Sequence, residues 1–254
     1  MIQTPETTRK HDRLAAFLQA FGLRASSDPG PRHLFVLGDR EGAPTEVVFR
    51  CRGGIVGQDA ARILASAGID FGGAMNPLVG ALPDELAFPL QTQPGMRALA
   101  ELLVGEEDVS RCGGATVRDR LCEVIVVLAI RRAIAAGTVT AGLLAGLADE
   151  VLAPCLVAIH DAPARTWPVA ELARRAGLSR THFSARFAAV VGMTPAAYVT
   201  SWRLAHGHSR LYAGGSVKAV ARDAGFGSQE AFSRAFSRAY GYPPSRVKRV
   251  ERAR

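Results

Sequence analysis

Polar side chains stand at matching places in two related segments of the C-terminal half. The two sets are Arg180, Thr181 and Ser184, then Gln229, Glu230, Ser233 and Arg234. Arginine can bond guanine through two N–H groups, glutamine can do the same for adenine, and glutamate can accept from cytosine, while serine and threonine allow close approach. These residue types predict contacts with the base edges of DNA. An ordinary solvated helix face is the alternative.

Both sets lie in an internal repeat. VAELARRAGLSRTHFSARFAAVVGMTP starts at Val169 and VKAVARDAGFGSQEAFSRAFSRAYGYPP starts at Val217. Identical residues recur 48 positions apart before the turn and 49 after it, with Gly227 as the inserted residue. In each copy, helical apolar spacing is interrupted by Gly177 or Gly225 and restarts after a serine that can cap a helix. Each copy therefore predicts a helix-turn-helix unit.

The apolar residues of each second helix decide which side chains face outward. The inward stripes are Phe183, Phe187 and Val190 in the first copy, and Phe232, Phe236 and Tyr240 in the second. Because residues three or four apart share one helix face, the polar sets face the other way. Ala185 also faces outward in the first unit, where it offers no hydrogen bond to a base.

A long helix is predicted between the two copies. Pro195 suits its first turn, and one face carries Tyr198, Trp202, Ala205 and Ser209. Such a connector would hold the two units in a fixed relation, as binding to successive major-groove segments about 34 Å apart requires.

Charge separates the chain into two parts. Residues 163–254 hold sixteen Lys or Arg and four Asp or Glu, a net charge of +12, whereas residues 1–162 carry −4. A basic part joined to a mildly acidic part is typical of a DNA-binding domain attached to another domain, although a solubilising surface charge is equally consistent. We expect Ser179, Ser228, Arg238 and Lys248 to contact phosphates.

Other classes of protein find little support. The polar N-terminus and the short apolar run of 124–130 predict a soluble, cytoplasmic protein without a membrane span. The cysteines show neither disulfide nor zinc spacing, and no nucleophile motif or phosphate-binding glycine loop appears, so we expect no metal, cofactor or catalysis. Cys122 and Cys155 lie among apolar residues and should be inert. Cys51 and Cys112 have arginine neighbours that favour the thiolate, so redox sensing is a minor hypothesis against incidental thiols.

The C-terminal part resembles the AraC/XylS family of bacterial transcription regulators. The segments that carry the resemblance are GLSRTHFSARFAAVVGMTPAAYVTSWRLAHGHSRL and SVKAVARDAGFGSQEAFSRAFSRAYGYPPSRVKR. The resemblance implies an all-α double helix-turn-helix domain over residues 151–254 that binds double-stranded DNA and works with RNA polymerase. It also implies that base contacts lie early in each recognition helix, and that the protein is an activator rather than a repressor.

The N-terminal part resembles the effector domain of a cupin-containing branch of that family, through DRLAAFLQAFGLRA, FGGAMNPLVGALPDEL and GGATVRDRLCEVIVVLAIRRAI. This implies an α+β chain in which residues 1–150 form a small β-barrel with dimerisation helices, a homodimer, and a small-molecule effector. HLFVL and TEVVFRCR are predicted strands, but about fifty residues are too few for a complete barrel, so the barrel should be reduced. His11 and His33 lack the histidine and glutamate pattern of metal-binding cupins.

Two predicted amphipathic helices follow the strands. The first carries Leu99, Leu102 and Leu103, and the second carries Val117, Leu121, Val124, Ile125, Leu128 and Ala129. Their apolar stripes form core, a dimer contact, or both.

The leading hypothesis is a sequence-specific DNA-binding transcription regulator whose N-terminal domain modulates dimerisation or DNA affinity. Two other functions are alternatives to it. One is an enzyme that carries a DNA-binding module, as DNA-repair alkyltransferases do. The other is an architectural DNA binder, for which two differently decorated recognition helices would serve no purpose.

Overall fold

The computed structural model describes residues 13–26, 30–54, 62–72, 75–107, 112–136 and 142–247. The elements of the N-terminal half are α1 (Ala15–Ala20), β1 (Arg24–Ser26), β2 (Leu34–Gly38), β3 (Pro44–Arg50), β4 (Ile63–Asp70), α2 (Pro77–Ala81), β5 (Glu85–Pro89), α3 (Pro94–Gly105), α4 (Gly114–Ala135) and α5 (Leu143–Ala148). The C-terminal elements are α6 (Ala153–Asp161), α7 (Val169–Arg175), α8 (Arg180–Val191), α9 (Pro195–Tyr212), α10 (Val217–Asp223), α11 (Gln229–Tyr240) and the 3-10 turn η3 (Pro244–Arg246). No helix in these stretches is long and apolar enough to cross a membrane.

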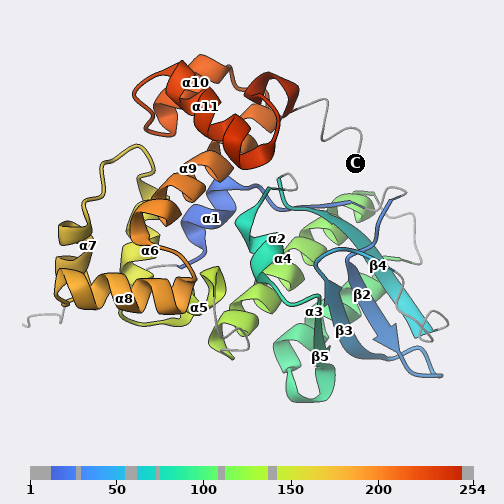
Figure 1. Cartoon of the computed structure of the whole chain (residues 1–254). Helices are drawn as coiled ribbons and strands as arrows, with labels where there is room; N and C mark the ends of the chain where they lie inside the picture. The colour runs from blue at the N-terminus through green and yellow to red at the C-terminus, as the bar shows by residue number, and fades with distance from the viewer. Residues whose placement is uncertain are drawn as a thin grey trace, which may run out of the picture.

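The strands form one antiparallel sheet in the order β1-β4-β2-β3-β5 (Figure 1). The central strand β2 pairs on both sides, with Leu34 opposite Phe49 of β3 and Ala67 of β4. Among the described residues, β1 and β5 stand at the edges and the sheet does not close. The predicted fold class, a reduced cupin-like domain followed by an all-α double helix-turn-helix domain, is confirmed, with an open sheet in place of a barrel.

Two helices cover one face of the sheet. Successive strand residues point to opposite faces, so Val36 and Phe49 belong to the hydrophobic cluster that lies between the sheet and these helices, α3 and α4, and that includes the fully buried Ile125 of α4. Phe35 and its neighbours form a separate small cluster on the other face. The predicted helices are confirmed, and their apolar stripes are only partly core.

The C-terminal half contains both predicted helix-turn-helix units. Helices α7 and α8 form the first, α10 and α11 form the second, and α9 connects them (Figure 1). Gly177 and Gly225 occupy the turns with φ of +67° and +76°, a region that glycine adopts without steric cost. The predicted inward face of α9 is buried, from Tyr198 through Trp202 to Ser209.

A single hydrophobic cluster joins the sheet half to the first helix-turn-helix unit, whereas the second unit has a cluster of its own. Helix α1 lies beside α6 and α9 (Figure 1), and its Phe17 ring is 4.9 Å from the Trp202 ring, centroid to centroid. Helix α5 contacts both α4 and α8. The predicted division into residues 1–150 and 151–254 stays a prediction, because buried side chains are continuous across it.

Candidate nucleic-acid interface

Helix α8 presents the first predicted set of base-contacting residues. Ser179 is its N-cap, and the Ser179 hydroxyl accepts a hydrogen bond from the His182 amide at 3.3 Å. Arg180 and Thr181 are exposed in the first turn, and Ser184 is half-buried. The cap fixes where the helix starts, so these side chains stand at its exposed N-terminal end.

Helix α11 is built in the same way. Ser228 is the N-cap and accepts from the Ala231 amide at 3.1 Å. Gln229, Glu230 and Arg234 are exposed, and Ser233 is half-buried.

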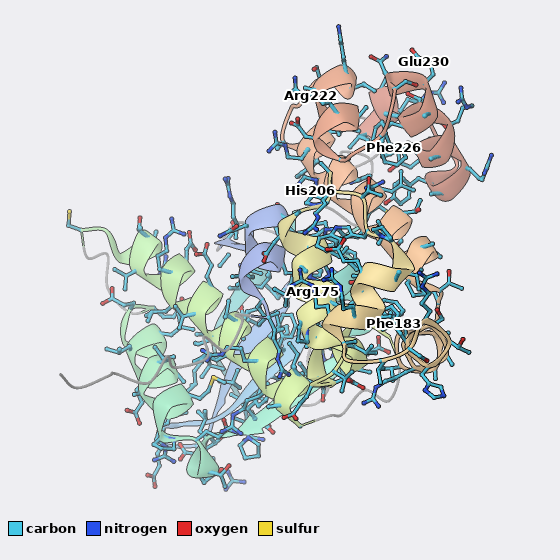
Figure 2. All side chains as sticks on the ribbon, turned by 90° about the vertical axis from the view of Figure 1, so that its left-hand side faces the viewer. Arg175, Phe183, His206, Arg222, Phe226 and Glu230 are labelled. Carbon is cyan, nitrogen blue, oxygen red and sulfur yellow. The ribbon has the colours of Figure 1, made fainter. Side chains whose placement is uncertain are left out.

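The Glu230 carboxylate already has hydrogen-bond partners within its own unit. The pKa of its carboxyl group is lowered by a hydrogen bond from its own backbone amide, then by one from the Ser228 hydroxyl and by the charge of Arg234. Contact with a cytosine amino group would therefore compete with these local partners. Figure 2 shows Glu230 at the outer edge of the second unit, distant from Phe183 in the first.

Aromatic pairs anchor both recognition helices from beneath. Phe183, Phe187, Phe232 and Phe236 are fully buried, and the two rings in each pair lie 5.6 Å and 5.5 Å apart. The predicted inward stripe is confirmed, since Val190 packs against the core while partly buried, and the neighbouring Val191 is buried as well.

Several of the basic residues have acidic partners. Arg165 pairs with Glu171 of α7, whereas Arg210 and Arg222 both pair with Asp223. Arg180, Arg234 and Arg238 are exposed, as contacts with DNA require, and Lys248 lies outside the described residues. The roles assigned to these residues stay predictions.

Arg186 was not predicted as a site residue, yet it sits on the recognition helix α8. Its Nε and Nη2 donate to one carboxylate oxygen of Asp149, at 3.1 and 2.8 Å. The other Asp149 oxygen accepts from the amides of Val151 and Leu152. This contact ties α8 to the residues between α5 and α6. Periodicity gives no sign of an ion pair between residues so far apart in the sequence.

One cysteine, Cys51, differs from the expectation about which thiols favour the thiolate form. Cys51 was expected to favour the thiolate, but burial and the negative charge of Asp84 raise its pKa to about 12 despite Arg52. Burial likewise raises the pKa of Cys122 to about 12 and of Cys155 to about 11, which agrees with inert thiols. Cys112 is exposed.

Two of the histidines, His33 and His208, have structural partners. The His33 Nδ1, just before β2, accepts from the Ile69 amide of β4 at 3.0 Å. His208 stacks on Phe236 and contacts the Tyr242 hydroxyl at 2.9 Å. Within the described residues, no group of three or more His, Cys, Asp or Glu side chains could hold a metal ion. His11 lies outside those residues.

Comparison with known proteins agrees with this geometry. A helix-turn-helix domain model matches residues 172–249, and a cupin model matches residues 20–135. A putative AraC-like transcription regulator of Streptomyces lividans is 34% identical over 224 residues, which cover 84% of this chain and 74% of the relative. One from Streptomyces antibioticus is 33% identical with the same coverage. The DNA-binding domain of AdpA, solved with a target DNA, is 28% identical with a TM-score of 0.38 and covers 41% of this chain and 95% of that chain.

The fold and the matched domains define a DNA-binding transcription regulator with a cupin-type N-terminal half. The chain belongs to the AraC/XylS family, in its cupin-containing branch.

Proposed function

We propose that this regulator recognises an asymmetric DNA site by placing α8 and α11 in two successive major-groove segments. The observation that carries the proposal is the matched construction of the two helices. Each starts at a capping serine, is anchored by a buried phenylalanine pair, and exposes unlike polar residues in its first turns. Two unlike exposed sets favour an asymmetric site over nonspecific binding.

Within each unit, we assign base contacts and phosphate contacts to different residues. Arg180, Thr181, Ser184, Gln229, Glu230, Ser233 and Arg234 contact base edges. Ser179, Ser228, Arg238 and Lys248 contact phosphates. Helix α11 exposes three long side chains able to bond bases, Gln229, Glu230 and Arg234, and α8 has Ala185 at the position that matches Arg234. The second unit therefore contributes more of the sequence discrimination.

The regulator acts as an activator together with RNA polymerase, as the family resemblance implies, and it has no catalytic role. For the N-terminal half, we infer that regulation works through the outer surface of the helices α3 and α4. Side chains of α3 and α4 fill the inner face of the sheet, which favours control through association over a ligand enclosed by the sheet.

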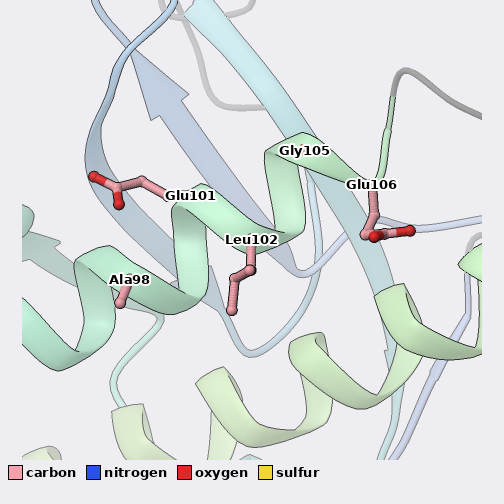
Figure 3. Close-up of a pocket in the computed structure, with 5 residues that line it drawn as sticks. All are labelled: Ala98, Glu101, Leu102, Gly105 and Glu106. Atoms are coloured by element: carbon pink, nitrogen blue, oxygen red, sulfur yellow. The ribbon is translucent and has the colours of Figure 1, made fainter.

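A homodimer through α3 and α4 is the association that the surface supports. Leu102 of α3 is 59% exposed, and Val117 and Val124 of α4 are 44% and 45% exposed. Leu102 borders a hollow of about 470 Å³ that it shares with Glu101 and Glu106 (Figure 3). Light scattering after size exclusion should give a dimer that Leu102→Glu weakens, whereas Met193→Glu, an exposed apolar residue of the C-terminal half, should not. If the wild-type chain is a monomer at micromolar concentration, the dimer proposal is wrong.

Selection from a random duplex pool followed by footprinting tests the DNA-binding proposal. We expect an asymmetric protected site over two major-groove segments, whereas equal affinity for all sequences at physiological salt would refute it. Arg234→Ala should relax the preference at one base position, with a cost of about 1–3 kcal/mol. Arg238→Ala should instead weaken all duplexes alike and reduce the salt dependence. Uniform losses in both variants would contradict the division of roles.

A further inference from the structure

The two helix-turn-helix units do not share a hydrophobic core. The core of the first unit continues into the sheet half and includes Trp202 of α9, whereas that of the second unit uses Leu204 and Leu211 of the same helix. Within the described residues, no shared apolar core therefore fixes the spacing between the two units. That spacing depends on the stiffness of α9 and on direct contacts of the second unit with neighbouring segments.

One such contact comes from the loop 162–168, which precedes the first unit. Arg203 of α9 holds this loop at two points: its Nε donates to the Pro163 carbonyl at 2.7 Å, and its Nη2 donates to the Arg165 carbonyl at 2.9 Å. The Trp167 indole N–H donates to the Ala162 carbonyl at 3.0 Å. Because a planar guanidinium donates in fixed directions, the backbone on both sides of Ala164 is held against α9.

The same loop meets the turn of the second unit, backbone against backbone. A Cβ atom added to Gly225 would lie 2.6 Å from the Ala164 Cα and 2.8 Å from the Ala164 carbonyl oxygen. Ordinary contacts start at 3.4 Å, so a methyl group there would push the two segments apart by about 0.8 Å. A Cβ at Gly177, the equivalent residue of the first unit, would meet nothing within 4 Å.

We propose that the loop 162–168, held by Arg203 and seated on Gly225, is the positioning element that sets the spacing between α8 and α11. The inference rests on the proposed function, in which both helices bind DNA at once. Hydrogen bonds to base edges tolerate a range of only a few tenths of an ångström. A shift of one unit by about 0.8 Å therefore prevents both helices from making their best contacts on one duplex.

The two turn glycines provide a matched pair of variants. Both have positive φ, so Gly225→Ala and Gly177→Ala impose the same kind of backbone strain on a helix-turn-helix turn. The probe is a duplex that the wild-type chain selects from a random pool. We expect Gly225→Ala to bind it about tenfold more weakly than Gly177→Ala does, with protection lost mainly over the segment that α11 contacts. Equal affinities and equal footprints would overturn the proposal.

Arg203→Lys gives a second test that does not depend on the turn. Lysine keeps the charge but lacks the forked donors that hold both carbonyls, so the loop 162–168 should move aside more easily when a side chain is added at residue 225. The loss caused by Gly225→Ala should then be smaller in the Arg203→Lys background, whereas the loss caused by Gly177→Ala should be unchanged. Additive losses for both glycines would contradict the coupling.

Spacing itself can be measured with a second probe that carries one extra base pair between the two protected segments. We expect the wild-type chain and Gly177→Ala to lose more affinity on this insertion than Arg203→Lys does. Equal penalties would refute a spacing role for the loop. A wild-type footprint over one segment alone would instead refute the proposed function, so the two failures are distinguishable.

Discussion

Replacing Phe17 by alanine should destabilise the folded protein by about 4 kcal/mol, because Phe-to-Ala changes in filled cores cost about 3–5 kcal/mol. The Phe17 side chain is fully buried, and its ring centroid lies 4.9 Å from that of Trp202, 5.6 Å from that of His160 and 5.1 Å from that of Phe21. Since small domains have a total stability of about 5–15 kcal/mol, this one side chain carries a large share.

The loss should appear in the DNA-binding half as well as in the N-terminal segment. Helix α1 has six residues and is too short to persist without tertiary contacts. Beside Phe17, this segment is held by Leu14 and Phe21, which are buried in the same cluster, and by hydrogen bonds: Arg13 Nη1 donates to the Leu147 carbonyl at 2.7 Å, and the Ser209 hydroxyl donates to the Ala20 carbonyl at 2.9 Å. Each hydrogen bond contributes about 0.5–1.5 kcal/mol, and the Phe21 ring still lies 5.4 Å from that of Trp202, so the loss of Phe17 should weaken the contact of the helix with α6 and α9.

Chemical denaturation measures the loss, and amide hydrogen exchange locates it. Phe35→Ala is the matched control, because Phe35 is 2% exposed but packs on the opposite face of the sheet. We expect Phe17→Ala to accelerate exchange in α6 and α9, and Phe35→Ala to accelerate it in the strands. The reasoning is refuted if exchange in α6 and α9 is the same in both variants, or if Phe17→Ala costs less than about 1 kcal/mol, far below the usual range.

Three further predictions concern buried contacts near the recognition helix α8. Burial lowers the pKa of His160 to about 3 from 6.5, so only the unfolded chain takes up its proton as the pH falls below about 6.5. The free energy of unfolding should then fall by up to about 1.4 kcal/mol per pH unit, and urea titrations of His160→Gln should show a smaller decrease. Asp149→Ala should destabilise the fold by about 1 kcal/mol more than Arg186→Ala, because only the aspartate also accepts two backbone amides; equal losses in denaturation would contradict this. Gly146→Ala should cost about 1–3 kcal/mol, since a Cβ there would lie 2.7 Å from the buried Leu156 side chain; an unchanged melting temperature would show that the site can relax.

Local periodicity accounts for what the sequence predicted well. The helix-turn-helix units and α9 follow from apolar spacing, turn glycines and capping serines within a few residues of one another, and the structure confirms these elements. The contact between Phe17 and Trp202 could not be predicted in this way, because it joins residues 185 positions apart in the numbering. Cys51 illustrates the same limit: its arginine neighbour was visible in the sequence, but the burial that dominates its pKa was not.

The two recognition helices are therefore connected to the N-terminal half by different routes. Helix α8 packs against α5, which contacts α4, and Arg186 binds Asp149 at the end of α5. A displacement of α4 or α5 is therefore transmitted to α8 through side chains that are already in contact. Helix α11 belongs to a separate core, and its connections to that half within the described residues run through α9 and through the contact between Ala164 and Gly225. A signal from the cupin half should thus alter the seating of the first unit before that of the second, although the second unit exposes the richer set of base-contacting side chains.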